Sequence, residues 1–211
     1  MYFSEVVRAN GHRKQQPNKN TYSDHQFMWG LFGHDGNKRD FLYTVHENKI
    51  YVVSNRIQNY KDSAIQVRTK PYEPSFKEGD SLRFDVRFNG ETRIGNDRKS
   101  LVNAYKERLG EDRDLNWNEL MHEAVGGWFN KNSKKYGFKV RDYHIRGYHH
   151  YSFVKMKKSS NLQNKSDKVR FDSLDIRGVL EVTGPAVFVN TLYQGIGKAR
   201  GYGCGLVLVA R

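Results

Sequence analysis

The chain has 211 residues, enough for one large domain or for two small ones of about 100 residues, each able to bury a hydrophobic core. Lys and Arg number 36 against 23 Asp and Glu, which gives a formal charge of +13, and 13% of the residues are aromatic. This balance indicates a polyanionic partner. No stretch approaches the roughly 18 consecutive apolar residues of a membrane-spanning helix, so we expect no integral membrane protein.

Cysteine usage and the N-terminal sequence indicate the compartment. Cys204 is the only cysteine, which excludes a disulfide framework and a zinc site built on a thiolate cluster. The N-terminal MYFSEVVRANGH carries Glu5 and Arg8 and lacks the basic and apolar regions of a signal peptide. We therefore expect a cytoplasmic protein in a reducing environment.

The first half of the chain predicts strands around one helix. Residues 2–8 alternate like a half-buried strand, 11–20 form a polar basic loop, and 22–33 have helical periodicity. RDFLYTVHENKIYVVSN, residues 39–55, is typical of a β-hairpin, and 81–89 alternate again. The predicted order is β, α, β, β, β.

The second half mixes helices with a long hairpin. A polar basic stretch at 90–100 comes first, followed by helices at 101–109 and 116–131. Strands at 136–158 and 168–183, joined by a polar tip, form the hairpin. A short helix at 184–194, a glycine-rich loop and the apolar strand GLVLVAR end the chain. Together the elements predict an α+β protein with two halves, 1–92 and 93–211.

The glycine-rich segment 195–205 does not have the spacing of a known nucleotide-binding loop. Ala199 follows Lys198 where a P-loop needs Ser or Thr, and only six residues follow Gly205 where a dinucleotide fold needs a helix and more strands. Its glycines allow close backbone approach to a phosphate, with charge from Lys198 and Arg200. A tight helix-to-strand connection explains the same glycines.

Tyr22 and His25 lie three residues apart near the start of the predicted helix, so they share one face where the helix dipole favours an anion. A phosphate can bind at such a place. Trp29 and Phe32 continue the face of His25, however, and this periodicity alone favours a partly buried structural histidine.

Basic residues gather in two segments. The predicted long hairpin carries Lys155, Lys157, Lys158, Lys165, Lys168 and Arg170, and the region before the helix at 101–109 carries Arg87, Arg93, Arg98 and Lys99. A charge run is usually a solvated face. Strand alternation nevertheless places Lys155 and Lys157 on one side, on a ribbon able to lie against a nucleic-acid groove, so we favour contact with RNA.

A His- and Tyr-rich stretch at 143–151 raises the question of a metal site. Its spacing matches no zinc pattern, and His122-Glu123 lacks the second His of a zinc-protease motif. Structural or RNA-stacking roles therefore fit these residues better.

Several motifs are similar to those of one family. The C-terminal loop reads Gly195-Ile196-Gly197, then KARGY, then Gly203-Cys204-Gly205; the N-terminal half carries MYFSEV, Tyr22-x-x-His25-x-x-x-Trp29-x-Leu31-Phe32, RDFLYTV and FDVRFNGETR. In these motifs the chain resembles the CRISPR repeat-processing endoribonucleases, specifically the CasE family of the Cascade surveillance complex. Gly90 stands where members often carry Pro, and residues 100–165 match weakly.

The resemblance implies two tandem ferredoxin-like, RNA-recognition-type halves with antiparallel sheets. It further implies cleavage of a repeat stem-loop RNA without metal or small-molecule cofactor, in which the 2′-hydroxyl attacks the scissile phosphate and a 2′,3′-cyclic phosphate forms. His25 would be the general base or acid, Tyr22 would orient the reacting groups, and Lys158 would stabilise the phosphorane.

The same resemblance implies partners and an RNA-binding surface. The product stem-loop would stay bound as guide RNA, next to other subunits of a Cascade-type complex, with no membrane involved. The predicted RNA contacts are Arg87, Asn89, Arg93, Arg98, Lys99, Lys155, Lys157, Lys165, Lys168, Arg170, Gly195, Gly197, Lys198, Arg200, Gly203 and Gly205.

Two other classes of protein remain open. A non-catalytic RNA-binding subunit explains the charge, the aromatic residues and the glycine loop equally well, and only Tyr22 and His25 argue for an enzyme. A DNA-binding protein would need a recognition motif, and no clear helix-turn-helix is present.

Overall fold

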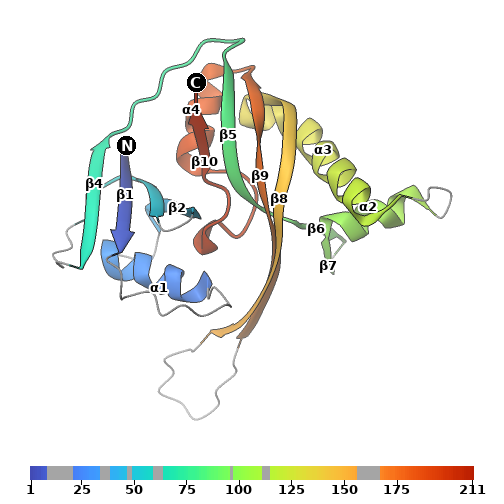
Figure 1. Ribbon diagram of the computed structural model, residues 1–211, viewed down its shortest axis with the longest axis horizontal. Helices are drawn as coiled ribbons and strands as arrows, with labels where there is room; N and C mark the ends of the chain where they lie inside the picture. Colours follow the sequence, from blue (N-terminus) through green and yellow to red (C-terminus); the bar gives the residue numbers. More distant parts are fainter. Residues whose placement is uncertain are drawn as a thin grey trace.

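The described residues form two four-stranded antiparallel sheets, each covered on one face by helix, and one small two-stranded sheet (Figure 1). The computed structural model describes residues 1–8, 21–33, 39–46, 49–58, 64–95, 97–110, 115–155 and 167–211. The first sheet contains β1 (Tyr2–Arg8), β2 (Phe41–His46), β3 (Lys49–Ser54) and β4 (Ile65–Pro71), in the order β2-β3-β1-β4. Helix α1 (Thr21–Phe32) lies between β1 and β2 in the sequence and packs on this sheet.

The second sheet has the order β10-β5-β9-β8 and carries the remaining helices. Its elements in chain order are β5 (Ser81–Asn89), the small hairpin β6 (Glu91–Ile94) and β7 (Asp97–Ser100), α2 (Leu101–Leu109), α3 (Trp117–Tyr136), β8 (Phe138–Lys155), β9 (Asp167–Val182), α4 (Pro185–Gln194), the 3-10 turn η1 (Arg200–Tyr202) and β10 (Val207–Ala210).

Both sheets follow the same plan. In each, the first strand of the half lies in the interior between the third and the last strand, and the second strand lies at the edge. The second half has helices in both crossovers, which is the β-α-β-β-α-β ferredoxin-like arrangement. The predicted tandem ferredoxin-like α+β fold is confirmed.

Local sequence explains where the elements begin and end. In β5 the residues Leu82, Phe84, Val86 and Phe88 are buried against the helices, as period-two alternation requires. Helix α3 begins with a capping box in which Asn116 accepts from backbone N–H groups, and it ends at Gly137 with φ +69°. Pro185 occupies the first turn of α4.

The boundary between the two sheets differs from the predicted division at residue 92. Strand β5 pairs with β9 and β10, so the change of sheet occurs between Pro71 and Ser81. The pairing partners of β5 are roughly 90 and 120 residues away in the sequence, and local alternation carries no information about a distant partner. The sequence had also not predicted β4, or the pairing of β6 with β7 within the polar stretch 90–100.

The other predicted helices and strands are confirmed where the structure describes them, although α3 continues to Tyr136, past its predicted end at residue 131. They include the strand at 2–8, the helix after residue 21, the hairpin at 39–55, both helices of the α2–α3 pair and the short helix before the glycine loop. The predicted basic loop at 11–20 and the tip of the long hairpin lie outside the described residues. In the part of the chain that the structure describes, no helix is long and apolar enough to cross a membrane.

Strands β8 and β9 form a long ribbon that extends past the body of the sheet toward α1 (Figure 1). The register runs from Phe138 opposite Val182 to Lys155 opposite Asp167, with irregularities near Val140 and Ile145. Such bulges bend a strand and increase its twist. The ribbon thereby connects the core of the second half to the first helix.

Gly178 in β9 offers a test of this tight packing. A Cβ there would lie 2.1 Å from the backbone oxygen of Asp142 in the neighbouring strand. We expect Gly178→Ala to lower the free energy of unfolding by about 3 kcal/mol because backbone, not a flexible side chain, must move.

The control is Gly127→Ala in α3, where a Cβ meets nothing within 4 Å. It should raise the free energy by up to about 1 kcal/mol. Urea denaturation followed by circular dichroism measures both, and equal changes would contradict the assigned packing.

Candidate active site

Helix α1 presents His25 toward the glycine-rich loop and Tyr22 toward the β8–β9 ribbon. Met28, Leu31 and Phe32 are buried against the sheet, whereas Tyr22 and His25 are half-buried, with their rings 6.1 Å apart. The sequence alone favoured a structural histidine at this position. The structure shows a partly accessible ring whose ring nitrogen Nδ1 makes a specific polar contact.

That contact is with the glycine-rich loop from the other end of the chain. His25 Nδ1 lies 2.7 Å from the carbonyl oxygen of Gly201, and the buried Tyr43 hydroxyl donates to the same oxygen at 3.1 Å. His25, Tyr43 and Gly201 come from α1, β2 and η1. One carbonyl therefore joins both halves of the protein at the candidate catalytic histidine.

Aromatic rings from the long ribbon complete the surroundings of His25. Tyr202 lies 5.0 Å from the His25 ring, and it contacts Phe153 of β8 and Phe171 of β9 at 5.2 and 5.6 Å. Phe153 also stacks on Tyr22 at 5.4 Å. Rings of this kind hold the site rigid and offer faces on which an RNA base can stack.

Arg39 is a cation that the sequence analysis did not single out. Its Nη1 lies 2.8 Å from the point that a Cβ on Gly201 would occupy, and the His25 ring lies 3.8 Å from the same point. Burial, and then Arg200, lower the pKa of Arg39 from its ordinary value. Arg39 begins the RDFLYTV motif, two residues before β2, and that position gives no indication of the loop it meets.

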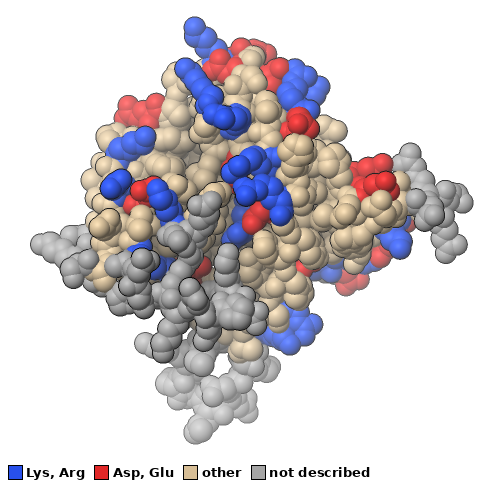
Figure 2. All heavy atoms as spheres, viewed as in Figure 1, with Lys and Arg blue, Asp and Glu red and all other residues tan. Residues whose placement is uncertain are grey.

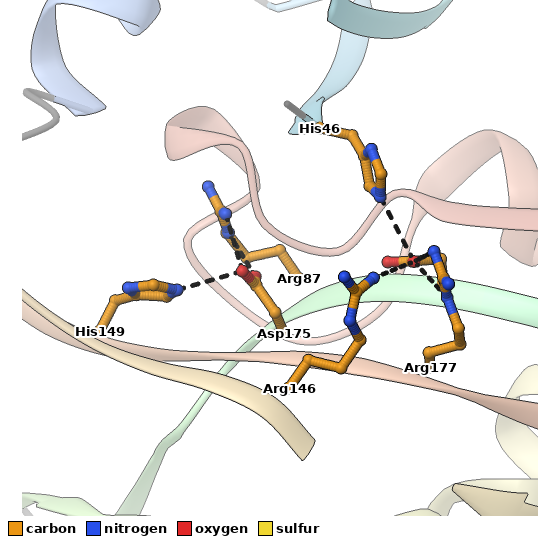
Figure 3. A network of polar contacts seen from close by, with 7 residues as sticks. His46, Arg87, Arg146, His149, Asp175 and Arg177 are labelled. Carbon is orange, nitrogen blue, oxygen red and sulfur yellow. Dashed lines mark hydrogen bonds and ion pairs between the residues drawn. The ribbon is translucent and has the colours of Figure 1, made fainter. Parts of the chain in front are cut away.

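A charged groove separates the two sheets on the side away from the helices of the second half (Figure 3). Asp175 receives two hydrogen bonds from Arg87, at 2.7 and 3.0 Å, and lies 3.1 Å from His149 Nε2. Burial alone would raise the pKa of Asp175, but the hydrogen bonds and charge of Arg87, with His149, hold it below its usual range.

A second carboxylate in the groove faces three basic groups. Asp85 lies 2.9 Å from Arg177, 3.7 Å from Arg146 and 3.6 Å from His46, which belongs to the first sheet. Figure 2 shows Lys and Arg side chains gathered near the centre of this face, over the second sheet, with acidic groups among them. The groove is thus substantially charge-paired within the protein itself.

Two of the predicted RNA contacts, Arg87 and Asn89, are mostly buried and bonded to groups of β9. Arg87 forms the bidentate pair with Asp175, and its side chain is 14% exposed. Asn89 is buried and donates to the backbone oxygen of Asp172. Their contact with RNA stays a prediction, and their observed role is to hold β5 against β9.

The other predicted basic contacts that the structure describes are exposed or half-buried. Lys99 is half-buried and paired with Glu107, and Arg200 is half-buried and donates to the backbone oxygen of Gln194. The exposed ones are Arg93, Arg98, Lys168, Arg170 and Lys198. Lys157, Lys158 and Lys165 lie outside the described residues, as does the side chain of Lys155. A catalytic role of Lys158 therefore stays a prediction.

The loop glycines make room for protein atoms. A Cβ on Gly195 would lie 2.7 Å from Leu42, and one on Gly205 would lie 2.3 Å from the carbonyl oxygen of Ile196. A Cβ on Gly197 would lie 3.4 Å from the ring of Phe88, and one on Gly203 would lie 3.3 Å from the ring of Tyr43. The close helix-to-strand connection is thus observed, and phosphate binding by these glycines stays a prediction.

Acidic and histidine side chains do not assemble into a metal-ligand set in the described ranges of the chain, where no group of three or more His, Cys, Asp or Glu is placed to hold an ion. Cys204 is buried, and burial raises the pKa of its thiol to about 12. A thiol with so high a pKa is a poor nucleophile near neutral pH.

The Asp175–Arg87 pair predicts a pH-dependent contribution to stability. Because the pKa of Asp175 is lowered in the folded protein, the pair stabilises above the unfolded Asp value near 3.9 and less as pH falls below it. We expect Asp175→Asn to reduce the free energy of unfolding at pH 7 by about 2–3 kcal/mol, since Arg87 loses its partner in a mostly buried place.

Urea denaturation at pH 7 and pH 3 measures this effect, with Asp97→Asn on the exposed β7 as the matched control. The control should change stability by less than about 0.5 kcal/mol. The difference between wild type and Asp175→Asn should shrink at pH 3, and a difference of equal size at both pH values would contradict the assignment.

Comparison with known proteins gives a family for the whole chain. Residues 1–211 match the family described as CRISPR associated protein. No curated protein sequence matches the chain significantly.

Several solved structures share its fold. Thermus thermophilus Cse3 bound to an RNA representing a pre-cleavage complex has a TM-score of 0.65 and 19% identity, over 100% of this chain and 98% of that one. Cas6e from Escherichia coli K-12 has a TM-score of 0.61 and 22% identity, over 100% and 99%. A chain of E. coli Cascade bound to a double-stranded DNA target has a TM-score of 0.51 and 20% identity, over 100% and 99%. By its full-length family match, the chain belongs to the CRISPR-associated proteins.

Proposed function

We propose that this protein is a metal-independent endoribonuclease that cleaves CRISPR precursor RNA at the base of the repeat stem-loop. The 2′-hydroxyl before the scissile phosphate attacks the phosphorus, the 5′-oxygen leaves, and a 2′,3′-cyclic phosphate forms. The observation that carries the proposal is the placement of His25 at the junction of α1, the glycine-rich loop and the β8–β9 ribbon. Two structures with this fold, both named CRISPR endoribonuclease Cse3 bound to 19 nt RNA, support it.

The chemistry needs a group that exchanges a proton near neutral pH, and an imidazole is the side chain suited to that task. His25 is partly accessible and oriented by a hydrogen bond, and Tyr22 lies beside it on the same helix face. In the proposed mechanism His25 acts as general base or acid and Tyr22 orients the 2′-hydroxyl or the phosphate. Lys158 remains the proposed third catalytic residue.

The RNA stem would bind along two basic hairpins. Arg93 and Arg98 face each other as cross-strand partners on β6 and β7, and both are exposed. Like charges in that arrangement destabilise a hairpin, and a bound phosphate backbone would relieve the repulsion. Lys168 and Arg170 add exposed positive charge on β9 of the long ribbon.

The stem contacts are the same before and after cleavage, so substrate and product bind alike and the processed guide RNA stays bound. The proposed partners are therefore the repeat RNA and other subunits of a Cascade-type complex. The fold shared with a chain of Cascade supports this assignment. We place the protein in the cytoplasm.

Single-turnover cleavage of a labelled repeat stem-loop in excess EDTA tests the proposed reaction. Wild type should cut the RNA, and His25→Ala should lower the rate by about 10²–10⁴-fold with binding unchanged, because only proton transfer is lost. A substrate with 2′-deoxyribose at the scissile position should bind and remain intact. Tight binding without cutting by wild type would instead support a non-catalytic RNA-binding subunit.

The salt dependence of RNA binding tests the assigned surface. Arg98→Ala should weaken binding of the stem-loop and reduce the slope of log affinity against log salt by about 0.9 for one lost phosphate contact. The control is Lys77→Ala, which removes the same charge before β5, at the opposite end of that strand from the β6–β7 hairpin. Filter binding at several salt concentrations measures both. A control slope that falls as much as that of Arg98→Ala would reject a specific contact.

A further inference from the structure

Two donors converge on one backbone oxygen beside the proposed catalytic group. His25 Nδ1 and the Tyr43 hydroxyl lie 2.7 and 3.1 Å from the carbonyl oxygen of Gly201. We propose that Tyr43 is a positioning residue that, by holding this carbonyl, keeps the proton of His25 on Nδ1 and reserves Nε2 for proton exchange with RNA. The inference rests on the proposed catalytic role of His25.

The chemistry of the two atoms determines which nitrogen carries the proton. A carbonyl oxygen only accepts hydrogen bonds, so a nitrogen 2.7 Å from it must donate. The neutral imidazole has one N–H, and this contact places it on Nδ1. The lone pair of the neutral ring is then on Nε2, and any proton that His25 takes from or returns to the RNA passes through that atom.

Tyr43 is built to hold the carbonyl in place. Its ring is fully buried in the core beneath α1, with Met28 and Phe41 in the same cluster. Burial raises the pKa of the Tyr43 hydroxyl well above its ordinary value, with Asp24 as the next cause, so the hydroxyl remains protonated and donates. Neither the ring nor the hydroxyl is placed to touch a substrate, and for this reason we do not call it catalytic.

The loop fixes the carbonyl from its own side. Tyr202 N–H donates to the oxygen of Ala199 at 2.8 Å, which closes the turn around Gly201, and Ala199 adopts the left-handed region with φ +54°. Gly205 N–H donates to the backbone oxygen of Arg87 in β5 at 2.7 Å. The turn is therefore anchored to the second half of the protein, while Tyr43 and His25 reach it from the first.

Tyr43→Phe is the sharpest test, because it removes one oxygen and keeps the buried ring. Substitution of Gly201 is less informative, since an added Cβ would also push against Arg39. The control is Tyr143→Phe, which removes a hydroxyl that likewise donates to a backbone oxygen, that of His122 in α3. Both variants should have the circular dichroism spectrum of wild type.

The readout is the tautomer of His25, from nitrogen NMR of protein labelled with ¹⁵N in its eight histidines. The signals of His25 are identified by their loss in His25→Ala. Wild type should show a protonated Nδ1 in the neutral ring. Tyr43→Phe should shift the population toward protonated Nε2 and slow single-turnover cleavage about three- to tenfold, as expected when one hydrogen bond is lost. The RNA affinity of Tyr43→Phe should equal that of wild type. Tyr143→Phe should match wild type in the tautomer population of His25, the cleavage rate and the RNA affinity.

The outcomes separate this inference from the function on which it rests. An unchanged tautomer population in Tyr43→Phe overturns the positioning role, whatever the cleavage rate. If Tyr43→Phe shifts the tautomer population without changing the cleavage rate, and His25→Ala also cleaves as fast as wild type, then His25 takes no part in the chemistry. A shifted population together with a slower rate supports both.

Discussion

The carbonyl of Gly201 organises the candidate site, because the groups that meet there are about 160 and 180 residues away in the sequence. His25 stands on the first helix and Gly201 in the last turn, so the site exists only when the C-terminal loop docks on the N-terminal sheet. That docking needs backbone to approach closely. Gly195 and Gly205, both with positive φ, leave no room for a side chain there. The glycine motif is therefore a condition for placing the histidine.

The long β8–β9 ribbon imposes a second constraint on the same site. Phe153 and Phe171 lie on its two strands, and both contact Tyr202 beside His25. Exposed basic residues lie on the same ribbon, at Lys168 and Arg170. The two strands of the ribbon pair in a fixed register, so a stem that it held would have a fixed position relative to His25. The positioning of a substrate is a large part of catalysis.

The sequence predicted what local patterns can encode. Strand β5 appears at residues 81–89 as its alternation indicated, and α3 begins after the Asn116 cap. The sheet that β5 joins was not predictable, because alternation specifies a buried face but no partner. The Tyr22–His25 pair followed from helical spacing. Its partner Gly201 did not, since a backbone carbonyl has no residue signature, and Tyr43 looked like an ordinary strand residue.

Basic residues in the sequence were the least reliable guide to the RNA-binding surface. Their distribution in the structure limits where the RNA stem can bind. Arg87 counted toward the basic surface in the sequence, yet it pairs with Asp175 inside the groove between the sheets. Asp85 likewise faces Arg146 and Arg177 there. A phosphate entering the groove would have to compete with these carboxylates. Of the predicted RNA contacts, Arg93 and Arg98 are exposed on the β6–β7 hairpin, and Lys168 and Arg170 are exposed on the β8–β9 ribbon. This distribution favours a stem that follows the two hairpins to α1 over one that lies between the sheets.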